Sequence, residues 1–191
     1  MLLFLRPLHL ALISVAIALP AAAQSTAEIS GLRYIGSVTV PNDKMVDGTL
    51  VGGLSGVDYD PVADLWYLIS DDKSENNPAR FYTAKLAFDQ ARFASLEIAH
   101  AVTLLQADGQ PYPNAKAGGE VPDPESIRHD PESDNLWWTS EGDRKLGASP
   151  FLRAATPDGQ FAEAFITPEI FRMNKDQEIG PRHNLGFEGL S

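Results

Sequence analysis

The chain has 191 residues, a net charge of −11 at neutral pH and no cysteine. The acidic balance argues against non-specific nucleic-acid binding, which needs clustered Lys and Arg side chains. It also means that an anionic substrate would need a bridging cation, although solubility alone can account for a charge of this size. Without disulfides, stability must come from packing, with or without bound metal ions.

The first 23 residues have the pattern of a secretory signal peptide. Arg6 lies in a short basic start, an apolar run extends from Leu8 to Leu19, and Ala21 to Ala23 supply small residues for cleavage. The run is too short to span a bilayer, and no later run is long enough. We therefore expect a signal peptide at 1–23, a mature domain at 24–191, and a periplasmic or secreted location. An uncleaved anchor is the alternative.

After this segment the chain consists of short alternating stretches separated by Gly, Pro, Asp and Asn, which is typical of an all-β protein. One strand is expected over residues 32–40. Two groups of four strands follow, and a long Gly/Pro-rich loop over residues 106–123 separates them. The expected strands of the two groups lie near residues 57–59, 66–69, 80–88 and 93–104, and near 125–130, 135–141, 150–155 and 160–166.

Residues 54–71 and 124–141 are two copies of one segment and align without a gap. Acidic Asp71 aligns with acidic Glu141, and a third copy begins near residue 187. Self-similarity of this kind indicates a repeat architecture, and four strands are the content of one propeller blade. We therefore predict a β-propeller-like fold of four-stranded blades. Since the chain stops inside the third copy, we expect an incomplete propeller, the front part of a longer protein. A β-sandwich is the main alternative.

The propeller prediction places several carboxylates together. The loop that enters the innermost strand of a blade and the loop that leaves its second strand lie on the same face of the ring. Carboxylates near one axis repel one another unless they are protonated or bind a cation, and hard oxygen ligands on flexible loops suit Ca²⁺. The expected calcium ligands are Asp71, Glu125, Glu141 and Glu188. Alternatively, Asp71 and Glu141 cap turns and stay solvated.

Catalytic signatures are few. His183 lies on a loop just before the third copy and is a candidate general acid or phosphate contact, and Glu188 is the other catalytic candidate. Residues 53–57 miss the nucleophile elbow because the last position is Val57. No phosphate-binding Gly-rich loop and no dinucleotide fingerprint occurs. His129 aligns with Tyr59 and is interpreted as structural.

Several motifs, taken in order, resemble the phytase-like family described by an esterase-like activity of phytase. They cover the mature chain from about Leu32 to its end and are Gly52-Gly53-Leu54-Ser55-Gly56-Val57-Asp58-Tyr59-Asp60-Pro61, Ile69-Ser70-Asp71-Asp72, Ala79-Arg80-Phe81-Tyr82, Asp123-Pro124-Glu125-Ser126-Ile127, Ser140-Glu141-Gly142 and Asn184-Leu185-Gly186-Phe187-Glu188-Gly189-Leu190. The resemblance implies an exported bacterial protein with a longer β-propeller-type domain. It also implies ester or phosphoester hydrolysis and kinship with calcium-dependent propeller phytases, which bind metal and phosphate on a carboxylate-lined face.

Two functions remain open at this point. The first is an exported hydrolase that acts on small phosphoric or other esters with the help of Ca²⁺, for which a lactonase-like propeller is a variant. The second is a non-catalytic envelope β-propeller that binds a ligand or a protein partner. The missing catalytic triad and the aromatic strands are consistent with the second function, and fold alone does not decide between them.

Overall fold

The structure is a computed structural model that describes residues 31–114 and 116–191, so the expected signal peptide at 1–23 lies outside the described residues. The chain divides into two units, residues 1–34 and 35–191. Every strand in the described part belongs to the second unit. Among the described residues, no helix is long and apolar enough to cross a membrane.

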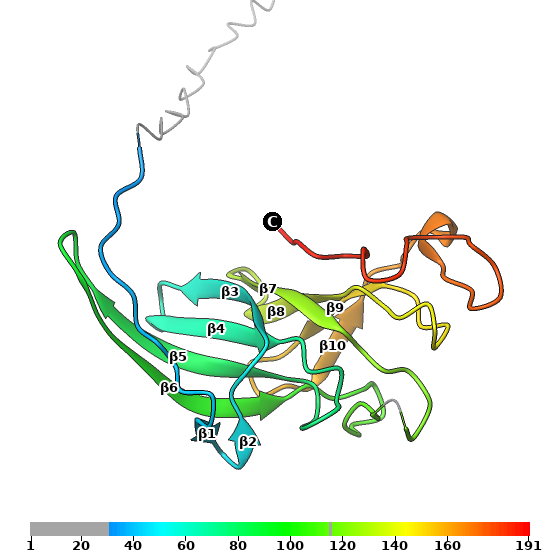
Figure 1. Cartoon of the computed structure of the whole chain (residues 1–191), viewed down its shortest axis with the longest axis horizontal. Helices are drawn as coiled ribbons and strands as arrows, with labels where there is room; N and C mark the ends of the chain where they lie inside the picture. Colours follow the sequence, from blue (N-terminus) through cyan, green and yellow to red (C-terminus); the bar gives the residue numbers. More distant parts are fainter. Residues whose placement is uncertain (1–30, 115) are drawn as a thin grey trace, which may run out of the picture. The chain divides into compact units, whose positions relative to one another are not determined.

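Two four-stranded antiparallel sheets make up most of the second unit (Figure 1). In each sheet, strands that follow one another in the chain are hydrogen-bonded neighbours, so each sheet is a simple meander. The first sheet contains β3 (Leu54–Asp60), β4 (Leu65–Ser70), β5 (Arg80–Phe88) and β6 (Phe93–Thr103). The second contains β7 (Pro124–Asp130), β8 (Asn135–Ser140), β9 (Phe151–Ala155) and β10 (Phe161–Ala164). The all-β class and the two four-strand groups are therefore confirmed.

Smaller elements flank the two sheets. The hairpin of β1 (Met45–Val46) and β2 (Thr49–Leu50) precedes them, and a 3₁₀ helix, η1 (Glu169–Phe171), follows. The strand expected over residues 32–40 is not formed. Gly36 has a φ of +131°, which interrupts an extended run. The carbonyl of Ile35 accepts a hydrogen bond from the Phe93 amide at 2.8 Å, so this segment meets the start of β6 without continuing as a ladder.

The main core lies between the two sheets. Trp138 on β8 is 1% exposed and packs edge-to-face on Phe151, with ring centroids 5.0 Å apart. Tyr112 comes from the long loop between the sheets and joins the same cluster. The loop over residues 106–123 is therefore tied to the core through an aromatic side chain. The buried members of this cluster are Tyr67, Ile69, Ala79, Phe81, Leu104, Tyr112, Ile127, Leu136, Trp138, Phe151 and Ala155.

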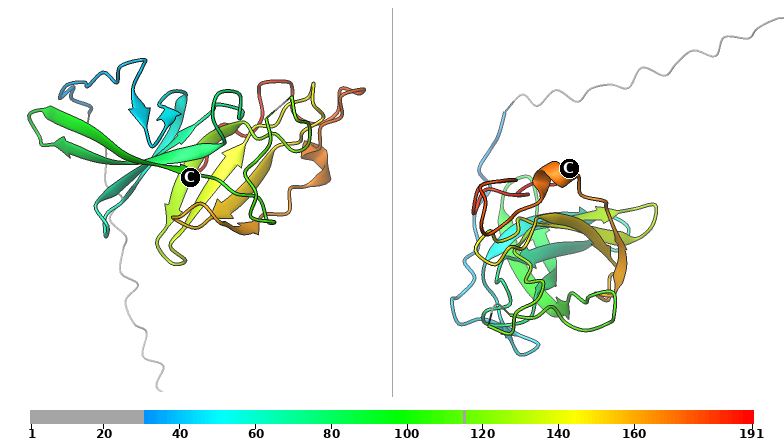
Figure 2. Two further views of the ribbon diagram at one scale, coloured as in Figure 1. Left: turned by 90° about the horizontal axis from the view of Figure 1, so that it is seen from below. Right: turned by 90° about the vertical axis from the view of Figure 1, so that its right-hand side faces the viewer.

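The innermost strands of the two sheets, β3 and β7, lie next to each other (Figures 1 and 2). The Ser55 hydroxyl donates a hydrogen bond to the Pro124 carbonyl at 3.1 Å. Further along the strands, the His129 amide donates to Asp58 Oδ2 at 2.8 Å. Two meanders with adjacent innermost strands are the arrangement of neighbouring propeller blades. The residues that the structure describes do not close a ring.

Gly56 permits the close approach of the two blades, which yields a prediction. A Cβ at Gly56 would lie 2.8 Å from the Ser126 Cα and 2.9 Å from the Glu125 carbonyl oxygen, whereas a Cβ at Gly52 would have no atom within 4 Å. We expect Gly56→Ala to lower the free energy of unfolding by about 1–3 kcal/mol, the usual cost of overpacking. We expect Gly52→Ala to leave it unchanged or slightly raised. Urea denaturation measures both, and equal effects of the two variants would contradict the blade contact.

Candidate metal centre

Three carboxylates meet where β7 begins and β8 ends. Asp123 directly precedes β7, Glu125 is its second residue, and Glu141 directly follows β8. The Asp123 amide donates to the Ser140 hydroxyl at 2.9 Å, and the Glu141 amide donates to the Asp123 carbonyl at 3.0 Å. One carboxylate oxygen from each of the three acids lies within 4.8 Å of the other two. The register of one hairpin thus brings the three acids together, and we call them the carboxylate cluster.

Asp123 is the most unusual member of the carboxylate cluster. It is 1% exposed, and neither of its side-chain oxygens accepts a hydrogen bond within the described structure. Lys73 Nζ lies 2.5 Å from Asp123 Oδ2 and forms an ion pair with it. A buried carboxylate without hydrogen bonds is costly unless a cation compensates it. Lys73 supplies one positive charge against three acids, so the carboxylate cluster keeps an excess of negative charge when all of its members are ionised.

Burial, and after it mutual repulsion, raises the pKa values of two of these acids. Burial, and then the charges of Asp123, Glu188, Glu141 and Asp71, raise the pKa of Glu125 to about 8. Burial and the charge of Glu141 raise the pKa of Asp123 to about 7, although Lys73 acts in the opposite direction. Without a bound cation, the carboxylate cluster consequently retains protons near neutral pH.

The four acids expected as ligands lie at different distances from this point. Glu125 and Glu141 belong to the carboxylate cluster. Asp71 directly follows β4 at an exposed position, and its pKa is raised by partial desolvation of the carboxyl and by the charge of Asp72. Glu188 is also exposed, and its pKa is raised by partial desolvation and by the charge of Glu141. Asp71 and Glu188 therefore contribute to the electrostatic field at Glu125 from outside the closest group.

Asp123 is the residue that sequence reasoning missed. It aligns with Gly53 of the first copy, so the comparison of the repeats gave no carboxylate at this position. Gly53 has a φ of +56°, and a Cβ there would overlap the carboxylate of Asp71. The available signal was an aspartate between two prolines, Pro122 and Pro124, directly before a predicted strand.

The start of the third copy is attached to the carboxylate cluster by its backbone. The Gly186 amide donates a hydrogen bond to Glu141 Oε2 at 3.3 Å. A Cβ at Gly186 would overlap the Glu141 carbonyl, so the close approach requires glycine. Phe187 packs edge-to-face on Phe171 of η1, with ring centroids 5.1 Å apart. These contacts hold the segment that carries Glu188 beside Glu141.

A cleft of about 460 Å³ lies among the segments around residues 50–53, 71–76 and 143–145. His183 lines it, with Nδ1 3.9 Å from Asp143 Oδ1 and without a hydrogen-bond partner in the described structure. Lys73 also lines the cleft and links it to the carboxylate cluster through its ion pair with Asp123. The residues that line the cleft include Asp71, Asp72, Lys73, Asp143, Lys145 and His183.

The donor set of the carboxylate cluster matches a hard cation. All of its side-chain ligand atoms are carboxylate oxygens, which suit Ca²⁺ at about 2.3–2.6 Å. Two oxygens on opposite sides of such an ion are about 4.8 Å apart, and the ligand atoms of the cluster lie within this distance of one another. Asp123, Glu125 and Glu141 are the residues that would hold the ion, which would compete with Lys73 Nζ for Asp123.

A family model named Phytase-like, described as "Esterase-like activity of phytase", matches residues 49–191. The comparisons with curated proteins and with solved structures gave no match. The family match spans both four-stranded sheets, the carboxylate cluster and the cleft. The chain therefore belongs to the Phytase-like family, and at this family level it is a phytase-like hydrolase.

Proposed function

We propose that the protein is an exported hydrolase of small phosphoric esters that works with a bound Ca²⁺ ion. The observation that carries the proposal is the carboxylate cluster: buried Asp123, with Lys73 as its charged partner, lies with Glu125 and Glu141 close enough for one cation to contact all three. The export part of the proposal rests on the expected signal peptide. Weak calcium binding would suffice for an exported protein, because extracellular modules bind calcium with dissociation constants of roughly 10⁻⁴–10⁻³ M.

The charges of the cleft favour a phosphoester with a bridging cation. Lys73 and Lys145 line the cleft and are candidates to bind phosphate oxygens. The Arg80 and Asp72 side chains pair at 2.8 Å and largely neutralise each other in the wall. Acidic residues nevertheless outnumber basic ones along the lining. A phosphate group would therefore be repelled unless a divalent cation offset the carboxylates.

The proposed reaction is a hydrolysis. A bound Ca²⁺ ion would neutralise charge on the phosphoryl group and favour ionisation of water. The water oxygen forms a bond to phosphorus and the ester P–O bond breaks. Glu188 is the proposed acceptor of the water proton, and His183 the proposed donor of a proton to the departing alcohol. Lys73 and Lys145 hold the phosphoryl oxygens during the step.

Hydrolysis of a generic phosphate monoester tests this function. We expect the full chain to release p-nitrophenol from p-nitrophenyl phosphate in millimolar calcium and to lose activity in excess chelator. Glu188→Gln and His183→Gln should each lower kcat by roughly 10²-fold or more, as expected for loss of a general acid or base. Glu163→Gln, on an exposed strand position away from the cleft, is the matched control.

Three outcomes would count against the proposal. Phosphatase activity that survives both chelator and Glu188→Gln would show that the carboxylates do not serve the reaction. Turnover of p-nitrophenyl acetate without turnover of the phosphate would favour a carboxylesterase. No turnover of either ester would favour a non-catalytic envelope protein that binds a ligand or a partner.

The raised pKa values predict how stability depends on pH in the absence of calcium. The pKa values of Glu125 and Asp123 are about 8 and about 7 in the folded chain, above their ordinary values of 4.5 and 3.8. The folded state therefore binds more protons than the unfolded state between these values, and stability falls as pH rises. We expect the urea midpoint in chelator to fall between about pH 5 and about pH 8, and to fall less in Glu125→Gln.

Calcium should oppose this loss because it binds the deprotonated carboxylates. At about pH 8, millimolar calcium should raise the urea midpoint of the wild-type chain more than that of Glu125→Gln. Other groups titrate in the same range, so the difference between wild type and Glu125→Gln is the decisive quantity, with Glu163→Gln as the charge-matched control. An identical pH dependence of all three chains would contradict the assignment.

A further inference from the structure

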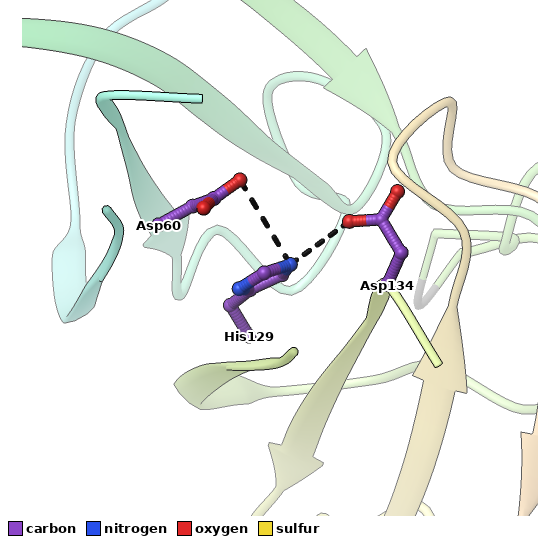
Figure 3. Close-up of side chains that lie close together, drawn as sticks. All are labelled: Asp60, His129 and Asp134. Carbon is purple, nitrogen blue, oxygen red and sulfur yellow. Dashed lines mark hydrogen bonds and ion pairs between the residues drawn. The ribbon is translucent and has the colours of Figure 1, made fainter. Parts of the chain in front are cut away.

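A second group of side chains of the types that coordinate metals lies at the opposite end of the innermost strands. Asp60 ends β3, His129 is the penultimate residue of β7, and Asp134 lies in the turn between β7 and β8. The carboxylate cluster lies at the other end of β7, about 20 Å away for a strand of this length. Figure 3 shows the imidazole of His129 between the two carboxylates. One ligand atom from each residue lies within 4.8 Å of the other two.

His129 occupies the position at which the first copy of the repeat has Tyr59. In the first copy, the Tyr59 hydroxyl donates a hydrogen bond to Asp64 Oδ1 at 2.8 Å. In the second copy, His129 replaces the tyrosine, and its Nε2 lies 2.9 Å from Asp134 Oδ1. The turn is therefore held in the same way in both copies. The second copy performs this task with an atom that can also coordinate a metal.

Asp60 and its counterpart Asp130 use their carboxylates differently. Both side-chain oxygens of Asp130 accept hydrogen bonds within its own turn. The bond to Oδ2 comes from the Ser133 hydroxyl at 2.6 Å. Alanine stands at the corresponding position of the first copy, Ala63, so that hydroxyl is absent. Asp60 Oδ2 instead faces the neighbouring blade and lies 4.0 Å from His129 Nε2.

Asp60 is also held in place by hydrogen bonds. Its Oδ1 accepts hydrogen bonds from the amides of Val62 and Ala63 at 2.7 and 3.2 Å. Burial raises the pKa of Asp60, but these amides outweigh it and bring the pKa below its ordinary value. The side chain is 6% exposed, as is that of His129. Two of the three ligands are thus held rigidly before any ion binds.

We propose that Asp60, His129 and Asp134 bind a divalent transition metal of the zinc class, which fastens the first blade to the second. One imidazole nitrogen and two carboxylate oxygens are a usual zinc donor set. In a tetrahedral zinc site, ligand atoms are about 3.4 Å apart. The 4.0 Å separation must therefore shorten and the 2.9 Å separation must lengthen, each by about half an ångström. The exposed Asp134 gives the ion access, and water completes the shell.

This site is separate from the carboxylate cluster in both position and chemistry. The cluster contains oxygen ligands alone and suits calcium, whereas an imidazole nitrogen selects transition metals over calcium. Tyr67 packs on the His129 ring, with centroids 5.9 Å apart and planes at 30°, and so keeps the imidazole in place. Zinc binding here does not depend on the proposed hydrolase function.

The test is a zinc titration of the untagged full chain by isothermal titration calorimetry, with millimolar calcium present to occupy the carboxylate cluster. We expect saturation at a single zinc ion per chain. His129→Tyr restores the tyrosine of the first copy and should preserve the bond to Asp134, but it should weaken zinc binding by at least about tenfold. Asp60→Asn keeps an oxygen for the turn amides and should weaken binding to a similar degree.

Glu125→Gln is the control and should bind zinc as the wild type does. A thermal melt gives an independent readout, because zinc should raise the Tm of the wild type and of Glu125→Gln but not that of His129→Tyr. Zinc binding that is equal in the wild type, His129→Tyr and Asp60→Asn would overturn the proposal. So would zinc binding that is lost only in Glu125→Gln, or no zinc binding by the wild type.

Discussion

The register of one hairpin, β7–β8, is the constraint on which the site depends. It sets the residue before β7 opposite the residue after β8, so that Asp123 and Glu141 share a backbone hydrogen bond of 3.0 Å. The carboxylates of these two residues consequently lie close to that of Glu125. Like charges so close either retain protons or bind a cation. The raised pKa values of Asp123 and Glu125 correspond to retained protons. The proposed calcium ion corresponds to a bound cation.

The two repeats share a scaffold but differ in their chemistry. In both copies, the turn of the innermost hairpin contains an aspartate at positive φ, Asp64 or Asp134. In both, the side chain of this aspartate contacts a ring-bearing residue of the preceding strand. At the other end, however, the first copy has Gly53 and Ser55 where the second has Asp123 and Glu125. The first copy thus provides close backbone contact and polar support, whereas the second provides charge. The second copy thus contributes the carboxylate cluster, whereas the first copy contributes Lys73 to the cleft beside it.

Part of this arrangement could be predicted from the sequence. Alternation and the gapless repeat gave both four-strand groups, because strand period and turn residues are local signals. The convergence of Glu125 and Glu141 followed from strand ends alone. Asp123 could not be recognised in this way, because its counterpart is Gly53 and its importance arises from burial. The expected strand at 32–40 failed at Gly36, whose positive φ is set by its tertiary position beside Phe93.

The central claim is that calcium replaces protons on the carboxylate cluster. Calorimetric titration of calcium into the chain at about pH 7, in buffers of different ionisation enthalpy, measures this exchange directly. The account predicts that the observed heat varies with the buffer, corresponding to release of about one proton per calcium ion bound. Calcium binding with a heat that is the same in every buffer, or no calcium binding at all, would contradict it.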